Sequence, residues 1–144
     1  MKTKKNKKSG FTLVELMIVA AIIAILAAIV IPLLAANRQR AIAAEGQNLL
    51  GVAASACKVY YAENGTFPTG IGVLPQQTQD ELGRGKYFPV PVLSAGGALG
   101  GYTLTATAGA AAGDLSGETI TLVQGTTGGQ TWGGTMQTKG IIKQ

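Results

Sequence analysis

The sequence contains no histidine and only one cysteine, and charged residues make up just 13% of its 144 positions. Without histidine there is no Ser-His-Asp or Cys-His catalytic pair and no His-ligated metal. A single cysteine excludes cysteine-rich zinc sites and a disulfide within the chain. Catalysis would have to rely on seven carboxylates and some hydroxyl groups. We therefore expect a protein that is not an enzyme and that carries no metal and no cofactor.

The excess positive charge lies at the N-terminus. The formal net charge is +5, and five of the twelve cationic residues fall within the first eight positions, namely Lys2, Lys4, Lys5, Lys7 and Lys8. The other 136 residues carry seven cations and seven anions. A protein that binds nucleic acid through a folded surface needs excess positive charge on that surface. We therefore expect no specific nucleic-acid partner, because a basic tip on a neutral body is typical of a targeting segment instead.

A long apolar run follows the lysines. Residues 16–36 form 21 consecutive uncharged positions. As a helix they would rise roughly 32 Å, enough to cross a hydrocarbon core of about 30 Å. The alternative is an ordinary cleaved secretory signal, but the apolar region of such a signal spans only about 7–15 residues. Glu15 also argues against a discarded segment, because a carboxylate in an apolar span costs roughly 2.5–3.5 kcal/mol on insertion. The run therefore predicts one membrane span.

The junction between the lysines and the span carries a specific motif. Residues 7–17 read KKSGFTLVELM, and the apolar run that follows contains Pro32. This segment resembles the N-terminus of a type IV prepilin of the type IVa kind, in which a short basic leader ends in glycine (Gly10), an aromatic residue follows (Phe11) and an acid lies one turn later (Glu15). The resemblance implies cleavage between Gly10 and Phe11 by a prepilin peptidase, and N-methylation of Phe11. It also implies assembly into a helical filament through Phe11, Glu15 and Pro32.

Elementary physical chemistry gives these residues compatible roles. Lysines before a membrane span keep that end in the cytoplasm, so the chain after about Asn37 would lie beyond the membrane. Cleavage after Gly10 would leave a free amine on Phe11 that is largely protonated at neutral pH. Glu15 could pair with the amine of its own chain or with that of a neighbouring copy, and the pilin resemblance favours the neighbour. The simpler alternative for Glu15 is a first-turn acid that interacts with the helix dipole.

The helical pattern continues beyond the apolar run and predicts one helix over residues 11–64. The second half of this helix is amphipathic, because apolar residues recur there at helical spacing opposite polar ones. We expect the helix to end at Asn64, since Gly65 can adopt a left-handed C-cap and Pro68 cannot continue a helix. The apolar residues at this spacing are Ile42, Leu49, Ala53, Ala56 and Tyr60.

Three residues should weaken the predicted helix. Pro32 removes one backbone hydrogen bond, so we expect a kink or a loosened turn just before it. Gly46 and Gly51 each reduce helix stability by up to about 1 kcal/mol relative to alanine. In a filament, local melting at Pro32 would let the helices bundle and the fibre stretch.

The rest of the chain predicts a small sheet. Residues 66–101 contain four prolines and are expected to be irregular, with one possible helical turn at residues 76–82. Alternation of apolar and polar residues predicts strands at 102–108 and 118–123, with a third over 131–136 and turns at 114–117 and 126–129. A small antiparallel sheet of three to four strands on the outer half of the helix is the economical arrangement. We therefore expect an α+β protein with the pilin fold.

Two further signals favour simple interpretations. Cys57 lies on the apolar face of the predicted helix and is expected to be a small buried residue, with an intermolecular disulfide as the alternative. Many type IV pilins close their C-terminal region with two cysteines, which this chain cannot do. Asp114, Ser116 and Glu118 have alternating oxygen side chains, but three ligands are too few for Ca²⁺ and a turn is the favoured interpretation.

Together these observations predict a pilin precursor with a cleaved leader at residues 1–10, a transmembrane and filament-core helix at 11–36, and a helical second half with a globular head at 37–144. Its function would be to polymerise into a type IV pilus used for adhesion, motility or DNA uptake. The expected partners are other copies of the chain, the prepilin peptidase, the inner-membrane assembly machinery and, before assembly, membrane lipid. The protein would lie in the inner membrane first and in an extracellular pilus on the bacterial surface afterwards.

Two alternatives remain open. The first is a pseudopilin of a type II secretion system, which would share the leader and the helix but form a short periplasmic pseudopilus. The second is a single-span anchor that carries an enzymatic or binding head. Such a head would require a polar cleft, and no set of residues in the sequence indicates one.

Overall fold

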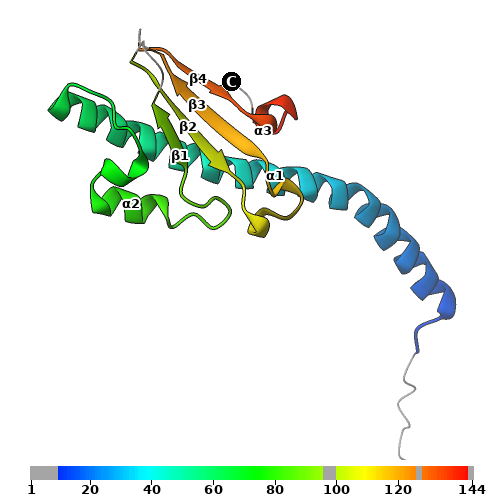
Figure 1. Ribbon diagram of the computed structural model, residues 1–144. Helices are drawn as coiled ribbons and strands as arrows, with labels where there is room; N and C mark the ends of the chain where they lie inside the picture. The colour runs from blue at the N-terminus through cyan, green and yellow to red at the C-terminus, as the bar shows by residue number, and fades with distance from the viewer. Residues whose placement is uncertain (1–9, 96–99, 126–127, 143–144) are drawn as a thin grey trace, which may run out of the picture. The chain divides into compact units, whose positions relative to one another are not determined.

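The computed structural model describes residues 10–95, 100–125 and 128–142 and shows an α+β protein, as predicted (Figure 1). Most of the predicted leader, residues 1–9, lies outside the described residues. The chain divides into two compact units between Asn37 and Arg38, and the long helix α1 (Leu13–Asn64) contributes to both. The two units are described in turn.

The first unit consists of the N-terminal part of α1 and the residues that lead into it. This part is long and apolar enough to cross a membrane, with a mean hydropathy of 3.1 over its most apolar window, and none of that window is buried by the chain itself. The helix passes through Pro32 without interruption. The expected loosening at Pro32 therefore does not break the helix.

The end of α1 lies at Asn64, as predicted from the sequence. Gly65 follows in the left-handed region with φ of +71°, which glycine adopts without steric cost. Its backbone N–H donates to the carbonyl oxygen of Tyr61 at 2.8 Å, and Asn64 Nδ2 donates to the carbonyl oxygen of Tyr60 at 2.9 Å. These two bonds satisfy carbonyl groups that a helix end would otherwise leave without a partner.

The second unit contains a four-stranded antiparallel sheet in the order β1-β2-β3-β4. Its strands are β1 (Val92–Ala95), β2 (Tyr102–Thr107), β3 (Thr119–Gln124) and β4 (Gln130–Gly133). The predicted strands at 102–108 and 118–123 are confirmed to within one residue at each end. Strand β1 was missed, because its four residues follow two prolines in a stretch expected to be irregular.

The third predicted strand, over residues 131–136, is wrong at its C-terminal end. Strand β4 stops at Gly133, and Met136 is buried on the short helix α3 (Thr135–Thr138). The change of direction occurs at Gly134, whose φ of +101° is strained for any residue with a side chain. A strand pattern cannot continue through such a residue, and the turn predicted at 126–129 lies partly outside the described residues.

Short helical elements connect α1 to the sheet and the strands to one another. They are η1 (Ile71–Val73), α2 (Gln76–Leu82) and η2 (Ala110–Leu115), and α2 has the bounds predicted for a helical turn. Gln79 joins α2 to η1, because its Nε2 donates to the carbonyl oxygens of Gly72 at 3.2 Å and Leu74 at 2.7 Å. Leu82, at the end of α2, is fully buried in the core.

The core of the second unit lies between the sheet and the second half of α1 (Figure 1). A side chain at Gly46 would approach Ile120 Cδ1 and Phe88 Cζ to 2.8 Å, so the glycine allows the sheet to pack closely against the helix. Tyr102 is buried here and its hydroxyl donates to the carbonyl oxygen of Ala54 at 3.3 Å. The buried residues of α1 are Ile42, Ala43, Gly46, Leu49, Leu50, Ala53, Ala54 and Cys57.

Cys57 is fully buried in this core, which confirms the prediction of a small buried residue. Burial raises the pKa of its thiol to about 11, because the thiolate would lose its hydration there. The thiol is therefore protonated at neutral pH and poorly reactive.

Candidate assembly site

The N-terminus of α1 is fixed by two side chains that bind each other. Thr12 Oγ1 accepts a hydrogen bond from the backbone N–H of Glu15 at 3.3 Å. In return Glu15 Oε2 accepts from the backbone N–H of Thr12 at 2.9 Å and from its hydroxyl at 2.8 Å. This reciprocal arrangement is a capping box, which satisfies donors at the start of a helix. The Thr-x-x-Glu spacing that signals a capping box is present in the sequence, although the box itself was not predicted.

The capping box decides what Glu15 can do chemically. All three hydrogen bonds join Glu15 to Thr12. The two that involve the Glu15 carboxylate are both accepted by Oε2. Among the described residues Glu15 Oε1 has no hydrogen-bond partner, and the side chain is exposed. Glu15 can therefore hold the start of its own helix through one oxygen and accept a donor from another molecule through the other.

Phe11 and Gly10 precede the helix in an irregular segment. The Phe11 side chain is 85% exposed. It borders a shallow groove of about 370 Å³ formed by its own segment and the first turns of α1. The groove is lined by Phe11, Thr12, Leu13, Leu16, Met17 and Ala20. The structure thus brings Phe11 and Thr12 to one surface, and Thr12 contacts Glu15 directly.

The structure does not bring Pro32 to this surface. Pro32 lies 17 residues after Glu15 on α1, which corresponds to about 26 Å of helix. Any contribution of Pro32 to assembly must therefore be made at a different level of the helix.

Large apolar side chains are exposed along the whole segment from Phe11 to Leu34. A contiguous apolar surface of this length is unfavourable in water and marks contact with lipid or protein. Besides Phe11 the exposed residues are Leu13, Val14, Leu16, Met17, Ile18, Val19, Ile22, Ile23, Ile25, Leu26, Ile29, Val30, Ile31, Leu33 and Leu34.

A second polar site, missed by the sequence analysis, joins α1 to the segment that leads into β1. Glu45 Oε1 accepts hydrogen bonds from the backbone N–H groups of Tyr87 at 2.7 Å and Phe88 at 3.3 Å. Glu45 is half-buried and holds a chain segment 42 residues away.

The C-terminal segment is fastened to β3 by polar side chains, which we call the C-terminal clasp (Glu118, Thr119, Thr135 and Lys139). Lys139 Nζ forms an ion pair with Glu118 Oε1. The backbone N–H of Thr119 donates to Thr135 Oγ1 at 2.8 Å, and that of Thr135 donates to Thr119 Oγ1 at 3.3 Å. The hydrogen bonds from Lys139 and then from Thr135 hold the pKa of Glu118 below its usual value.

The ion pair in the C-terminal clasp involves Glu118, one of the three residues considered above as possible Ca²⁺ ligands. Glu118 is directed to Lys139 and not to Asp114, which lies within η2. In the described ranges no group of three or more Asp, Glu, Cys or His side chains is placed to hold a metal ion. The structure therefore gives no support to a calcium site at these residues.

Comparison with known proteins connects this geometry to a family. Residues 5–31 match the model of the prokaryotic N-terminal methylation motif. The chain is 38% identical over 104 residues to the fimbrial protein EcpC of Eikenella corrodens, an alignment that covers 70% of this chain and 64% of that protein. It is 35% identical over 66 residues to the type II secretion system core protein G of Aeromonas hydrophila, covering 46% of each chain. The same protein of Vibrio cholerae is also 35% identical over 66 residues, covering 46% of this chain and 45% of that protein. The chain thus spans less than two thirds of the length of these relatives.

Proposed function

We propose that the chain belongs to the type IV pilin-like family, which includes pilins and pseudopilins, and that it is a structural subunit that polymerises through its N-terminal helix into a type IV pilus on the cell surface. The observation that carries this proposal is the exposed apolar segment of α1, most of which lies within the match to the N-terminal methylation motif at residues 5–31. The second unit has a core of its own, and none of the most apolar window of α1 is buried. Lipid covers it before assembly, and other copies of the same segment cover it in the filament.

A fimbrial role is favoured over the pseudopilus by the extent of similarity. The alignment with the fimbrial protein covers 104 residues, whereas the alignments with the secretion proteins cover 66. A match confined to 66 residues can be carried largely by the shared N-terminal helix, because that helix alone accounts for 52 residues. The pseudopilus of a type II secretion system, located in the periplasm, is the second candidate, supported by the two secretion relatives.

Processing would prepare the subunit for assembly. The lysines hold the N-terminus in the cytoplasm, and the prepilin peptidase cuts between Gly10 and Phe11. Phe11 then carries a methylated, positively charged amine. In the membrane interior a lone carboxylate is costly, so Glu15 gains from pairing with such a cation. The incoming copy supplies the Phe11 amine, which donates to Glu15 Oε1 while Oε2 remains bound to Thr12.

Electron microscopy of sheared surface material, combined with mass spectrometry of the N-terminus, tests this function. We expect long surface fibres composed of a chain that begins at methylated Phe11. Deletion of the prepilin peptidase is the matched control and should leave the full-length precursor in the membrane and no fibres. Short fibres confined to the periplasm would favour the pseudopilus. A mature chain that starts after Pro32 would instead identify an ordinary secretory signal and contradict the filament.

A further inference from the structure

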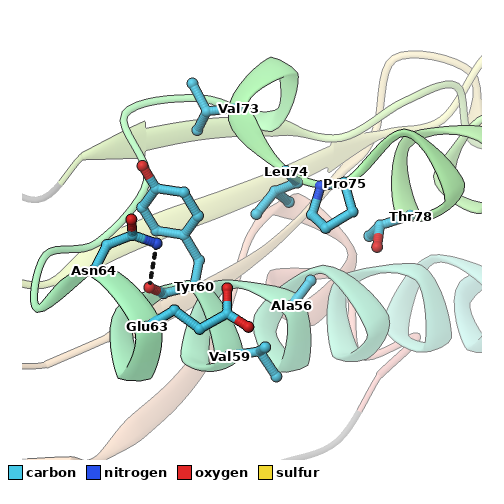
Figure 2. Close-up of a pocket in the computed structure, with 9 residues that line it drawn as sticks. All are labelled: Ala56, Val59, Tyr60, Glu63, Asn64, Val73, Leu74, Pro75 and Thr78. Atoms are coloured by element: carbon cyan, nitrogen blue, oxygen red, sulfur yellow. Dashed lines mark hydrogen bonds between the residues drawn. The ribbon is translucent and has the colours of Figure 1, made fainter.

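The second unit has a groove between the C-terminal part of α1 and the segment that contains η1 and the start of α2, which we call the head groove (Figure 2). It has a volume of about 370 Å³ and mostly apolar walls, and the Glu63 carboxylate points toward it. Two of its valines, Val59 and Val73, are 57% and 48% exposed. The lining residues are Ala56, Val59, Tyr60, Glu63, Asn64, Val73, Leu74, Pro75 and Thr78. Glu63 is the single charged residue in this lining.

A second surface of the same unit has the opposite charge. It is formed by residues 83–92, between α2 and the start of β1, and we call it the basic loop. Val90 and Val92 are exposed on this loop, and the Val90 side chain lies next to Gly83. Its two cations are Arg84 and Lys86.

Lys86 is the cation of the basic loop that has fewer carboxylates around it. Arg84 lines one surface with Asp80 and Glu81, and it shares a second surface with Lys86, Glu45 and Glu81. Lys86 Nζ lies 5.1 Å from the centre of the Tyr87 ring, and Oε1 of the neighbouring Glu45 accepts hydrogen bonds from backbone N–H groups. In the described part of the chain the one ion pair joins Glu118 and Lys139, so neither Lys86 nor Glu63 is engaged in one there.

The two surfaces complement each other in polarity as well as in charge. Each combines one available charge with two exposed valines, negative in the head groove and positive in the basic loop. Together they hold four of the six large apolar side chains that are exposed in the described part of this unit. Those six are Val59, Tyr61, Val73, Val90, Val92 and Val123.

The two surfaces do not meet within one copy. The hydrogen bonds from Tyr87 and Phe88 fix the basic loop at the level of Glu45 on α1, whereas the head groove is centred near Tyr60. Fifteen residues of helix separate these levels, or about 22 Å. A second copy that is shifted along the helix axis by this distance would place its basic loop level with the head groove of the first.

A fibre built from one kind of chain needs such a pair of surfaces. Contacts that repeat without closing are heterologous, which means that one patch of each copy binds a different patch of the next. We propose that the basic loop of one copy binds in the head groove of a neighbouring copy, with Lys86 paired to Glu63 and Val90 packed against Val59 and Val73. This interface rests on the proposed polymerisation and adds a contact between heads to the contact between apolar helices.

Disulfide cross-linking in assembled fibres tests the contact directly. Val73→Cys and Val90→Cys are introduced together into the full-length chain, and sheared fibres are oxidised and run on a non-reducing gel. We expect a ladder of covalent multimers, because each copy would be linked to two neighbours. Each single variant and the unmodified chain, whose Cys57 is buried, are the controls and should give no ladder.

Charge reversal provides a second test that does not depend on the cysteine pair. Glu63→Lys and Lys86→Glu should each lower the yield of fibres about tenfold, the change that corresponds to about 1.4 kcal/mol. The double variant should recover to within about twofold of the original chain, because the pair is restored with its charges exchanged. Asp114→Lys makes the same charge change as Glu63→Lys at an exposed acid outside both surfaces and should leave the yield unaltered.

The outcomes separate this interface from the polymerisation on which it rests. Normal fibres that give no ladder and tolerate both reversals would overturn the head contact and leave the pilus intact. A ladder obtained when Val73→Cys is combined with Arg40→Cys, and not with Val90→Cys, would also overturn it, because a different segment would then occupy the groove. An unmodified chain that never forms fibres would overturn both proposals. If the cysteine pair does not assemble, failure of the double charge variant to recover is sufficient to reject the contact.

Discussion

The two halves of α1 share one continuous helical backbone but differ in what their side chains contact. Before Asn37 the large apolar side chains are exposed, and after it a stripe of apolar side chains packs into the core beneath the sheet. The apolar side chains of the first half are therefore available to bind lipid or other molecules, whereas those of the second half stabilise the fold of their own chain. A helical pattern in a sequence can thus serve assembly or folding. A helix that is apolar on all sides is available for assembly, whereas a helix with polar residues along one face packs its apolar face into the core of its own chain.

The largest expected effect comes from removing the single charge in the first half. Glu15→Leu should still insert and be cleaved after Gly10, because losing the carboxylate makes insertion easier by roughly 3 kcal/mol. Fibres should nevertheless be absent from cells without the original copy, since no acid remains to receive the incoming Phe11 amine. Immunoblotting of membranes and electron microscopy of sheared material measure the two properties.

Thr12→Val is the control for Glu15→Leu, because it breaks the capping box but keeps the carboxylate. We expect it to reduce fibre number without abolishing fibres. Fibres of normal number and length in Glu15→Leu would show that Glu15 is only a first-turn helix acid.

Separating the halves should be the next largest change. A fragment that starts near Asn37 should be a folded, soluble monomer, because it keeps the whole core of the second unit and loses the apolar segment. Gel filtration and circular dichroism check this, with the full-length chain in detergent for comparison. An unfolded fragment would mean that the head depends on neighbouring copies for its stability.

The second half contains a matched pair of glycines that sharpens the comparison further. Gly46→Ala should destabilise the head by about 1–3 kcal/mol, because the new methyl group would overpack the core against Phe88 and Ile120. Gly51→Ala should stabilise it by up to about 1 kcal/mol, because a side chain there meets open space and the helix gains propensity. Guanidinium denaturation followed by Trp132 fluorescence measures both variants. Equal effects would mean that helix propensity, and not packing, controls this region.

The smallest effect concerns the pH dependence of the C-terminal clasp. The pKa of Glu118 is lower in the folded chain than its usual value. Its contribution to stability is therefore present above the unfolded pKa and is lost as the pH falls through the lower, folded pKa. Between pH 7 and pH 3 the unfolding midpoint of the original chain should fall slightly more than that of Glu118→Gln. Parallel slopes for the two proteins would show that the exposed pair with Lys139 contributes nothing measurable.

Long, regular patterns were predictable from the sequence. The helix end at Asn64, the turn of α2 and strands β2 and β3 follow from local patterns that continue over several residues, or from a glycine with a fixed role. Strand β1 could not be found in this way. It has four residues, and its identity as a strand depends on pairing with β2, a contact that no local pattern specifies.

The sequence predicted the residues Phe11 and Glu15 of the candidate site, but it did not predict the hydrogen bonds that the side chains there form. The Thr-x-x-Glu spacing indicates the capping box at Thr12 and Glu15, whereas the charge of Glu15 alone predicts only a first-turn acid on the helix dipole. Glu45 carries no such signal. Its bonds to Tyr87 and Phe88 arise from the packing of distant segments, and an acid on a polar helix face looks the same whether or not backbone groups approach it.

The clasp between α3 and β3 has a consequence for where the head can fold. Its fastening uses an ion pair and hydroxyl groups, so closing the C-terminal segment requires no oxidant and no thiol exchange. The thiol of Cys57, the one cysteine of the chain, is buried in the core and protonated at neutral pH. The native state should therefore form equally well in a reducing and in an oxidising compartment, and millimolar dithiothreitol should leave its thermal transition unchanged.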